Sequence, residues 1–84
     1  MTFHEANFLA LRKIGVVNAT RLKSPQFICN VINEHLYNAT DAVIEKKDQN
    51  VYVLTLTFGD VQDTFDVTMS YNETDNYYKI TNFE

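Results

Sequence analysis

The sequence has few of the residues that small proteins use to reinforce a modest core. Its 84 residues include one cysteine, two glycines, one proline and no tryptophan. A single cysteine, Cys29, excludes an internal disulfide, and two histidines are too few for a cysteine–histidine zinc framework. Gly15 and Gly59 stand too far apart to form a glycine-rich phosphate loop. The core must therefore come from apolar side chains, and at 45% of the chain there are enough of them.

Long apolar runs are also missing. None approaches the roughly 20 residues that a membrane-spanning helix needs. The N-terminus has no basic stretch and carries Glu5 and Asn7 where the apolar part of a secretory signal would lie. With one cysteine and no signal, a reducing, cytoplasmic location is expected. Three Asn-x-Thr sequons, at Asn18, Asn38 and Asn72, would be glycan sites in a secreted protein, but turns and strand ends also explain Asn and Thr there.

The charge is unevenly distributed. The net charge is −4: residues 1–40 carry four basic and two acidic groups, and residues 41–84 carry three basic and nine acidic groups. An acidic balance argues against nucleic acid as the main partner, because nucleic-acid phosphates repel it. It suits a protein partner with a basic surface, since complementary charge speeds encounter. The simpler alternative is a surface that only maintains solubility.

A first helix is predicted over residues 3–13. Thr2 and Glu5 form the spacing of a capping box, and apolar residues then recur at helical intervals. Gly15 is well placed to end the helix in the left-handed conformation. The next segment, 16–23, is ambiguous between a short edge strand and a connector.

A second helix is predicted over residues 25–37. Ser24 is a good cap, and Pro25 at the first helical position loses no hydrogen bond. Asn38 is a plausible end. One broad face of this helix is apolar, and its members are Phe27, Ile28, Val31, Ile32 and Leu36, with His35 beside them.

After residue 40 the apolar period changes from 3.6 to 2, which predicts strands. Gly59-Asp60 reads as a two-residue hairpin loop, which places Leu54 opposite Phe65. A slip of one residue would bury threonines and an aspartate instead, at about 1–3 kcal/mol for each unpaired polar group. The same comparison of registers, applied to the loops on either side of this hairpin, gives four sequential antiparallel strands at about 41–47, 51–58, 61–71 and 77–83.

The expected fold is therefore a single α+β domain over residues 1–84, with N-terminal helical sequence followed by a four-stranded β-meander and the helix at 25–37 packed on one face of the sheet. The element order is similar to cystatin-like and NTF2-like architectures, a similarity of shape that does not imply function. The predicted inner face comprises Ala42, Ile44, Tyr52, Leu54, Leu56, Phe58, Val61, Phe65, Val67, Met69, Tyr71, Tyr78 and Ile80. On the outer face, Val51, Val53, Tyr77 and Phe83 could meet a partner, a second copy or the first helix.

No catalytic or metal-binding constellation is recognisable, so no enzyme activity, cofactor or metal is predicted. Cys29 and His35 share a helix but are too far apart for a direct thiol–imidazole bond. An enzyme would require His35, Asp63 and Tyr71 to meet in a cleft. Asp63 is unusual, because the register points it inward beside Leu56, where it could cap a helix or bond a tyrosine hydroxyl.

The leading hypothesis is a small non-enzymatic binding module that occludes a basic site on a protein partner, as an immunity, antitoxin or phage inhibitor protein does. The hypothesis is based on the hairpin around residues 71–78, which combines carboxylates with tyrosines. Tyrosine is a residue type enriched at interface hot spots. The predicted partner-binding residues are Glu73, Asp75, Tyr77, Asp60 and Asp66. The alternatives are an ordinary solvated hairpin, a subunit of a homo-oligomer such as a homodimer, and a small-ligand carrier. The carrier cavity would be lined by Tyr52, Phe65, Met69 and Tyr78.

Overall fold

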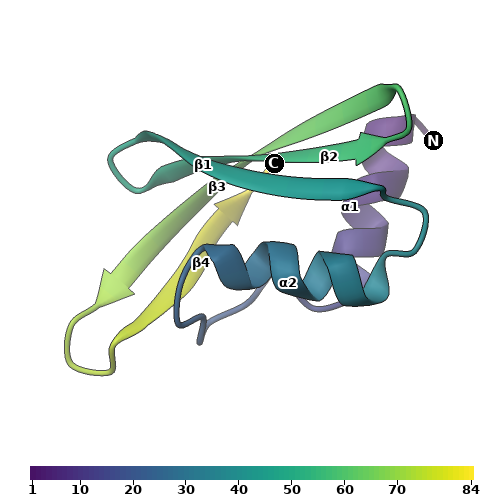
Figure 1. The fold of residues 1–84 in the computed structure, drawn as a ribbon. Helices are drawn as coiled ribbons and strands as arrows, with labels where there is room; N and C mark the ends of the chain where they lie inside the picture. Colours follow the sequence, from purple (N-terminus) through teal and green to yellow (C-terminus); the bar gives the residue numbers. More distant parts are fainter.

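The computed structural model describes residues 1–84 and contains two helices followed by a four-stranded antiparallel sheet (Figure 1). The strands follow one another in the order β1-β2-β3-β4, so each is hydrogen-bonded to its neighbour in sequence. The predicted α+β class and meander order are confirmed.

Helix α1 (Phe3–Lys13) begins at the predicted capping box. The backbone N–H of Glu5 donates to Thr2 Oγ1 over 3.1 Å, and the backbone N–H of Thr2 donates to the Glu5 carboxylate over 3.3 Å. These bonds satisfy N–H groups that have no partner within the helix. Gly15, with a φ of 90°, follows the last turn in the left-handed conformation that glycine adopts without steric cost. The predicted bounds 3–13 match the helix.

Helix α2 (Gln26–His35) ends two residues earlier than the predicted 25–37. Ser24 does not cap it: Pro25 takes the N-cap position, and no side chain bonds to the first turn. At the other end, Leu36 leaves the helical conformation, with φ −107° and ψ 85°, and its side chain is buried. If α2 continued for another turn, the Leu36 side chain would not occupy this buried position. Burial of Leu36 therefore accounts for the early end of the helix.

The four strands are β1 (Asp41–Asp48), β2 (Val51–Phe58), β3 (Val61–Asn72) and β4 (Tyr77–Phe83). The predicted pairings are confirmed in all three hairpins: Leu54 lies opposite Phe65 in the central one, Ile44 opposite Leu54 in the first, and Tyr71 opposite Tyr78 in the last. Alternation and turn length together were sufficient to set this register.

The outward placement predicted for Phe83 is wrong. A β-bulge in β4 leaves Thr81 without a partner, so that Met69 pairs with Ile80 but Thr68 pairs with Asn82. An extra residue reverses which face the later side chains occupy. Phe83 therefore turns inward, is buried and packs near Phe65, with ring centroids 5.5 Å apart.

The segment 16–23 lies along the free edge of β4. Leu22 forms an isolated antiparallel bridge with Tyr78, and the backbone N–H of Ile80 donates to the carbonyl of Ala19 over 2.8 Å. The segment is thus neither a full strand nor a simple connector. It satisfies backbone groups that an uncovered edge would leave open.

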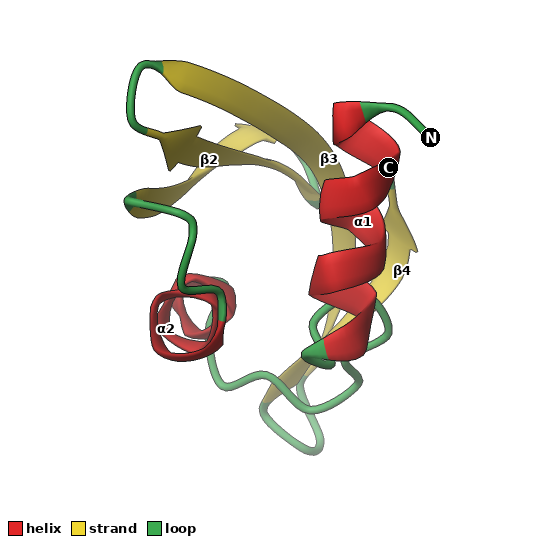
Figure 2. Ribbon diagram, turned by 90° about the vertical axis from the view of Figure 1, so that its right-hand side faces the viewer, coloured by secondary structure: helices red, strands yellow, loops and turns green.

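Both helices pack on the inner face of the sheet, while the outer face carries none (Figures 1 and 2). The sheet curls around α2 (Figure 2). The same view shows α2 end-on and α1 from the side, so the axes of the two helices are not parallel. Contacts between Phe3 and Phe58, with centroids 5.2 Å apart, and between Phe8 and Phe83, 6.2 Å apart, place α1 at the end of this inner face.

One continuous core fills the space between the layers. Its buried members are Leu11, Val16, Val17, Leu22, Ile28, Cys29, Ile32, Leu36, Ala42, Leu54, Leu56, Phe65, Val67, Met69, Ile80 and Phe83. Two residues predicted for the inner face, Val61 and Tyr71, are 50% and 47% exposed, because they lie at the sheet ends, beyond the helices.

Candidate functional site

The β3–β4 hairpin projects past the start of α2 as a separate arm (Figure 1). Its turn is held by local hydrogen bonds: Asn72 Oδ1 accepts from the backbone N–H groups of Thr74 and Asp75, over 2.9 and 3.3 Å, and the Tyr71 hydroxyl donates to Asn76 Oδ1 over 3.0 Å. Asn76 is left-handed, with a φ of 60°. The turn that carries the predicted carboxylates is therefore well defined before any partner binds.

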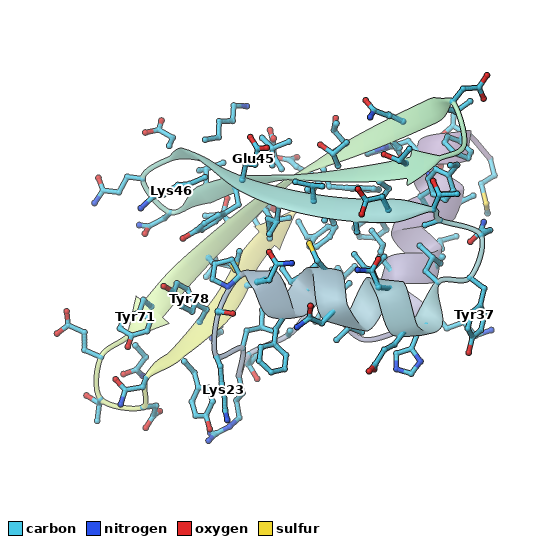
Figure 3. All side chains as sticks on the ribbon, in the orientation of Figure 1. Lys23, Tyr37, Glu45, Lys46, Tyr71 and Tyr78 are labelled. Carbon is cyan, nitrogen blue, oxygen red and sulfur yellow. The ribbon has the colours of Figure 1, made fainter.

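Glu73 and Asp75 lie exposed at this turn, and neither has a basic group within 4.0 Å. Tyr71 and Tyr78 form a tilted pair on the inner face of the arm, with ring centroids 4.8 Å apart (Figure 3). Tyr52, on β2, completes the group: its own burial, and after that the nearby Tyr78, raise the pKa of its hydroxyl. The arm thus ends in free carboxylates beside tyrosines that are only partly covered.

Tyr77 lies on the outer face of the arm, where it meets a residue that the sequence patterns did not place there. The guanidinium carbon of Arg21 lies 4.3 Å from the centre of the Tyr77 ring, a cation–π distance. Arg21 lies close to Tyr77 because the segment 16–23 follows the edge of β4. A groove of about 320 Å³ opens beside it, and its lining residues are Thr20, Arg21, Ser70, Asn72, Asp75, Tyr77 and Lys79.

The five predicted partner-binding residues do not form one surface. Asp60 lies in the β2–β3 turn, at the opposite end of β3 from Glu73 and Asp75. The strand has 12 residues, which at about 3.3 Å per residue separates the two turns by roughly 40 Å. Asp66 lies midway along β3, and its carboxylate is 3.5 Å from Lys47 Nζ. Only Glu73, Asp75 and Tyr77 come together.

The three residues that an enzyme would have brought into one cleft are also dispersed. His35 ends α2, Tyr71 lies on the projecting arm, and Asp63 faces α1. Asp63 instead bonds two residues of α1: one carboxylate oxygen is 2.7 Å from His4 Nδ1, and the other accepts from Asn7 Nδ2 over 2.8 Å. We call His4, Asn7 and Asp63 the α1 anchor. Sequence reasoning missed it, although an inward aspartate needs donors.

Both ring nitrogens of His4 face acceptors, since Nε2 lies 3.2 Å from the backbone carbonyl of Glu84. The imidazole also stacks on Phe65, with centroids 4.2 Å apart. The hydrogen bond to Asp63 is the main reason that the pKa of His4 is raised, and burial opposes it. This arrangement favours the protonated imidazole and places both ring nitrogens within hydrogen-bonding distance of acceptors.

The groove beside His4 has no hydroxyl or thiol side chain in its lining. It measures about 440 Å³ and is lined by His4, Glu5, Phe8, Leu9, Phe83 and Glu84. The only thiol, that of Cys29, is fully buried, and burial raises its pKa to about 11. We therefore assign the α1 anchor a structural role.

The α1 anchor predicts a pH-dependent stability. Because the folded protein binds the His4 proton more tightly than the unfolded chain, this contribution is fully present below pH 6.5 and is lost as the pH rises through the raised pKa. Thermal unfolding from about pH 6 to about pH 9 should therefore show a larger loss of stability in the wild type than in His4→Gln, which keeps a donor but cannot titrate. The loss that the buried Cys29 thiol causes near the upper end of this range is common to both proteins.

His35→Gln is the matched control, because this exposed histidine lies outside the α1 anchor and its one ion-pair partner is Glu34, at 3.6 Å. Its pH profile should follow that of the wild type. A wild-type profile that coincides with that of His4→Gln over the same range would contradict the assignment of a proton to the His4–Asp63 contact.

Neither helix is long and apolar enough to cross a membrane. No three or more His, Cys, Asp or Glu side chains gather where they could hold a metal ion. Comparison with protein-family models, with curated proteins and with solved structures found no match to this chain.

Proposed function

We propose that this protein is a small non-enzymatic binding module that occludes a basic site on a protein partner, as immunity, antitoxin and phage inhibitor proteins do. The observation that supports this most is the projecting β3–β4 arm (Figure 1). It presents Glu73 and Asp75 without basic partners, next to the half-exposed ring of Tyr71. Unpaired carboxylates on a rigid turn can bind basic groups of a partner without first breaking internal ion pairs.

The arm also limits the entropic cost of binding. Its turn is already ordered by the bonds of Asn72 and Tyr71, so less conformational freedom is lost when a partner docks. Tyr71 adds a large amphipathic ring with few rotatable bonds, and tyrosine is enriched among residues that dominate interface energies. The acidic second half of the chain, residues 41–84, would draw a basic partner toward the arm.

A buried, unpaired Cys29 fits a reducing, cytoplasmic location, which we include in the proposal. The carrier alternative lacks a cavity: Phe65 and Met69 are buried in a continuous core, and no groove of the molecule is lined by these residues, Tyr52 or Tyr78. A homo-oligomer formed through the open edge of β1 is disfavoured by the charges of Glu45 to Asp48 on that edge.

Reversing both charges of the arm should abolish most of the binding. The partner is first captured from the source lysate on immobilised wild-type protein and identified, and its affinity is then measured in solution. With Glu73→Lys/Asp75→Lys we expect at least about tenfold weaker binding, roughly 1.4 kcal/mol or more, and a smaller dependence of affinity on salt.

The matched control is Glu45→Lys/Asp60→Lys, which makes the same change in net charge at exposed positions of β1 and of the β2–β3 turn. It should bind within about twofold of the wild type. Equal affinity for the wild type and the arm variant would remove the arm as the binding site, and equal losses in both variants would reduce its role to that of general charge.

A further inference from the structure

Two basic side chains emerge next to each other where the segment 16–23 meets β4. Leu22 and Tyr78 exchange both backbone hydrogen bonds, over 3.0 and 2.7 Å. Arg21 precedes Leu22 and Lys79 follows Tyr78, and both side chains line the groove of about 320 Å³ beside Tyr77. On the other side of β4, Lys79 pairs with Ser70 of β3. Arg21, Lys79 and Ser70 thus form a row across the outer face.

No ion pair neutralises Arg21 or Lys79, although Asp75 also lines the groove. The ion pairs of the molecule involve His4, His35 and Lys47, and neither Arg21 nor Lys79 has an acidic oxygen within 4.0 Å. Like charges that line the same groove repel each other. A bound anion would relieve that repulsion, so the chain holds an unfavourable arrangement here that a ligand can improve.

The guanidinium carbon of Arg21 lies over the Tyr77 ring, 4.3 Å from its centre. Stacking uses the face of the guanidinium and leaves the N–H donors at its edge free for two parallel bonds to oxygen atoms. The groove of about 320 Å³ adds donors from Thr20, Ser70 and Asn72. Asp75 also lines the groove, and its carboxylate repels an anion on that side.

We propose that this groove binds a phosphate group, which is held by Arg21 and Lys79 and oriented by the hydroxyl and amide donors beside them. A fork-shaped guanidinium, an ammonium and hydroxyl donors together match the several oxygen atoms of phosphate better than the two of a carboxylate. The groove shares Asn72, Asp75 and Tyr77 with the arm, but the proposal does not depend on a basic partner, because Arg21 and Lys79 hold the phosphate.

The test is an amide-resolved NMR titration of the ¹⁵N-labelled protein with sodium phosphate at constant pH, with sodium chloride at matched ionic strength as the reference. We expect saturable shifts confined to the groove, with a dissociation constant on the order of 1 mM for the isolated ion. Arg21→Gln and Lys79→Gln should each weaken binding at least about fivefold, and Arg21→Lys should recover part of it because the charge returns without the fork.

The matched control is Arg12→Gln/Lys13→Gln, which removes two positive charges from the end of α1 and should leave phosphate binding unchanged. Sodium acetate provides the remaining comparison. Shifts that grow without saturation, that chloride reproduces, or that persist in Arg21→Gln would overturn the site, and an equal affinity for acetate would overturn the assignment to phosphate.

Discussion

Replacing Phe65 with alanine is expected to lower the free energy of unfolding by about 3–5 kcal/mol. The side chain is 1% exposed at the centre of β3, stacks on His4 with centroids 4.2 Å apart and contacts Phe83 at 5.5 Å. Its removal would open a cavity where α1 meets the sheet. An 84-residue domain has about 4–13 kcal/mol of stability in total, so this one change could leave much of the chain unfolded.

Urea unfolding followed by circular dichroism measures the loss, and Phe27→Ala serves as the control. Phe27 is 42% exposed on α2, so the same truncation there should cost less than about 1 kcal/mol. If Phe65→Ala were no more costly than Phe27→Ala, the packing of α1 on the inner face would be wrong. Should Phe65→Ala fail to fold at all, Phe65→Leu would provide a smaller, measurable loss of the same sign.

The register of the sheet was predictable because each alternative had a high local cost. A slip at the Gly59-Asp60 turn would have buried Thr64, Asp66 and Thr68 in place of apolar residues, and the loop lengths allowed no compensation. The left-handed Asn50 and Gly59 are similarly local, since their conformation depends on the turn that contains them.

The bulge at Thr81 was not predictable in this way. One extra residue costs little when both the earlier and the later part of a strand gain from it, and here the gain is burial of Phe83. An apolar aromatic at the end of an outward-facing series was the available signal. Only the packing of Phe83 against Phe8 and Phe65, which lie far away in sequence, decides in favour of burial.

The candidate sites show the same difference between contacts that are local in sequence and contacts that are not. Glu73, Asp75 and Tyr77 belong to one hairpin, so their proximity followed from the turn alone. The approach of Arg21 to Tyr77, and that of His4 to Asp63, join residues more than fifty positions apart. Periodicity shows which face of an element is apolar, but it does not show where a helix or a connecting segment docks.

Removing the Asp63 carboxylate should release α1 from the sheet and lower the free energy of unfolding by about 2–3 kcal/mol. Asp63 is 12% exposed and accepts from Asn7, which is the one buried polar residue of the molecule. In Asp63→Ala the amide of Asn7 keeps its buried position but loses its acceptor. The other donor, His4, is 44% exposed and can bond to water instead, so most of the loss arises at Asn7.

A double-mutant cycle separates this bond from simple truncation. Asn7→Ala and Asp63→Ala are measured singly and together, and the double variant should lose about 1–2 kcal/mol less than the sum of the single losses, because it leaves no unsatisfied donor. Amide hydrogen exchange should also speed up in α1 of Asp63→Ala before it does in β2 and β3, because local opening begins where an element has lost its attachment. Additive losses, or uniform exchange across helix and sheet, would show that Asn7 and Asp63 do not act as a pair and that α1 is held by its apolar contacts alone.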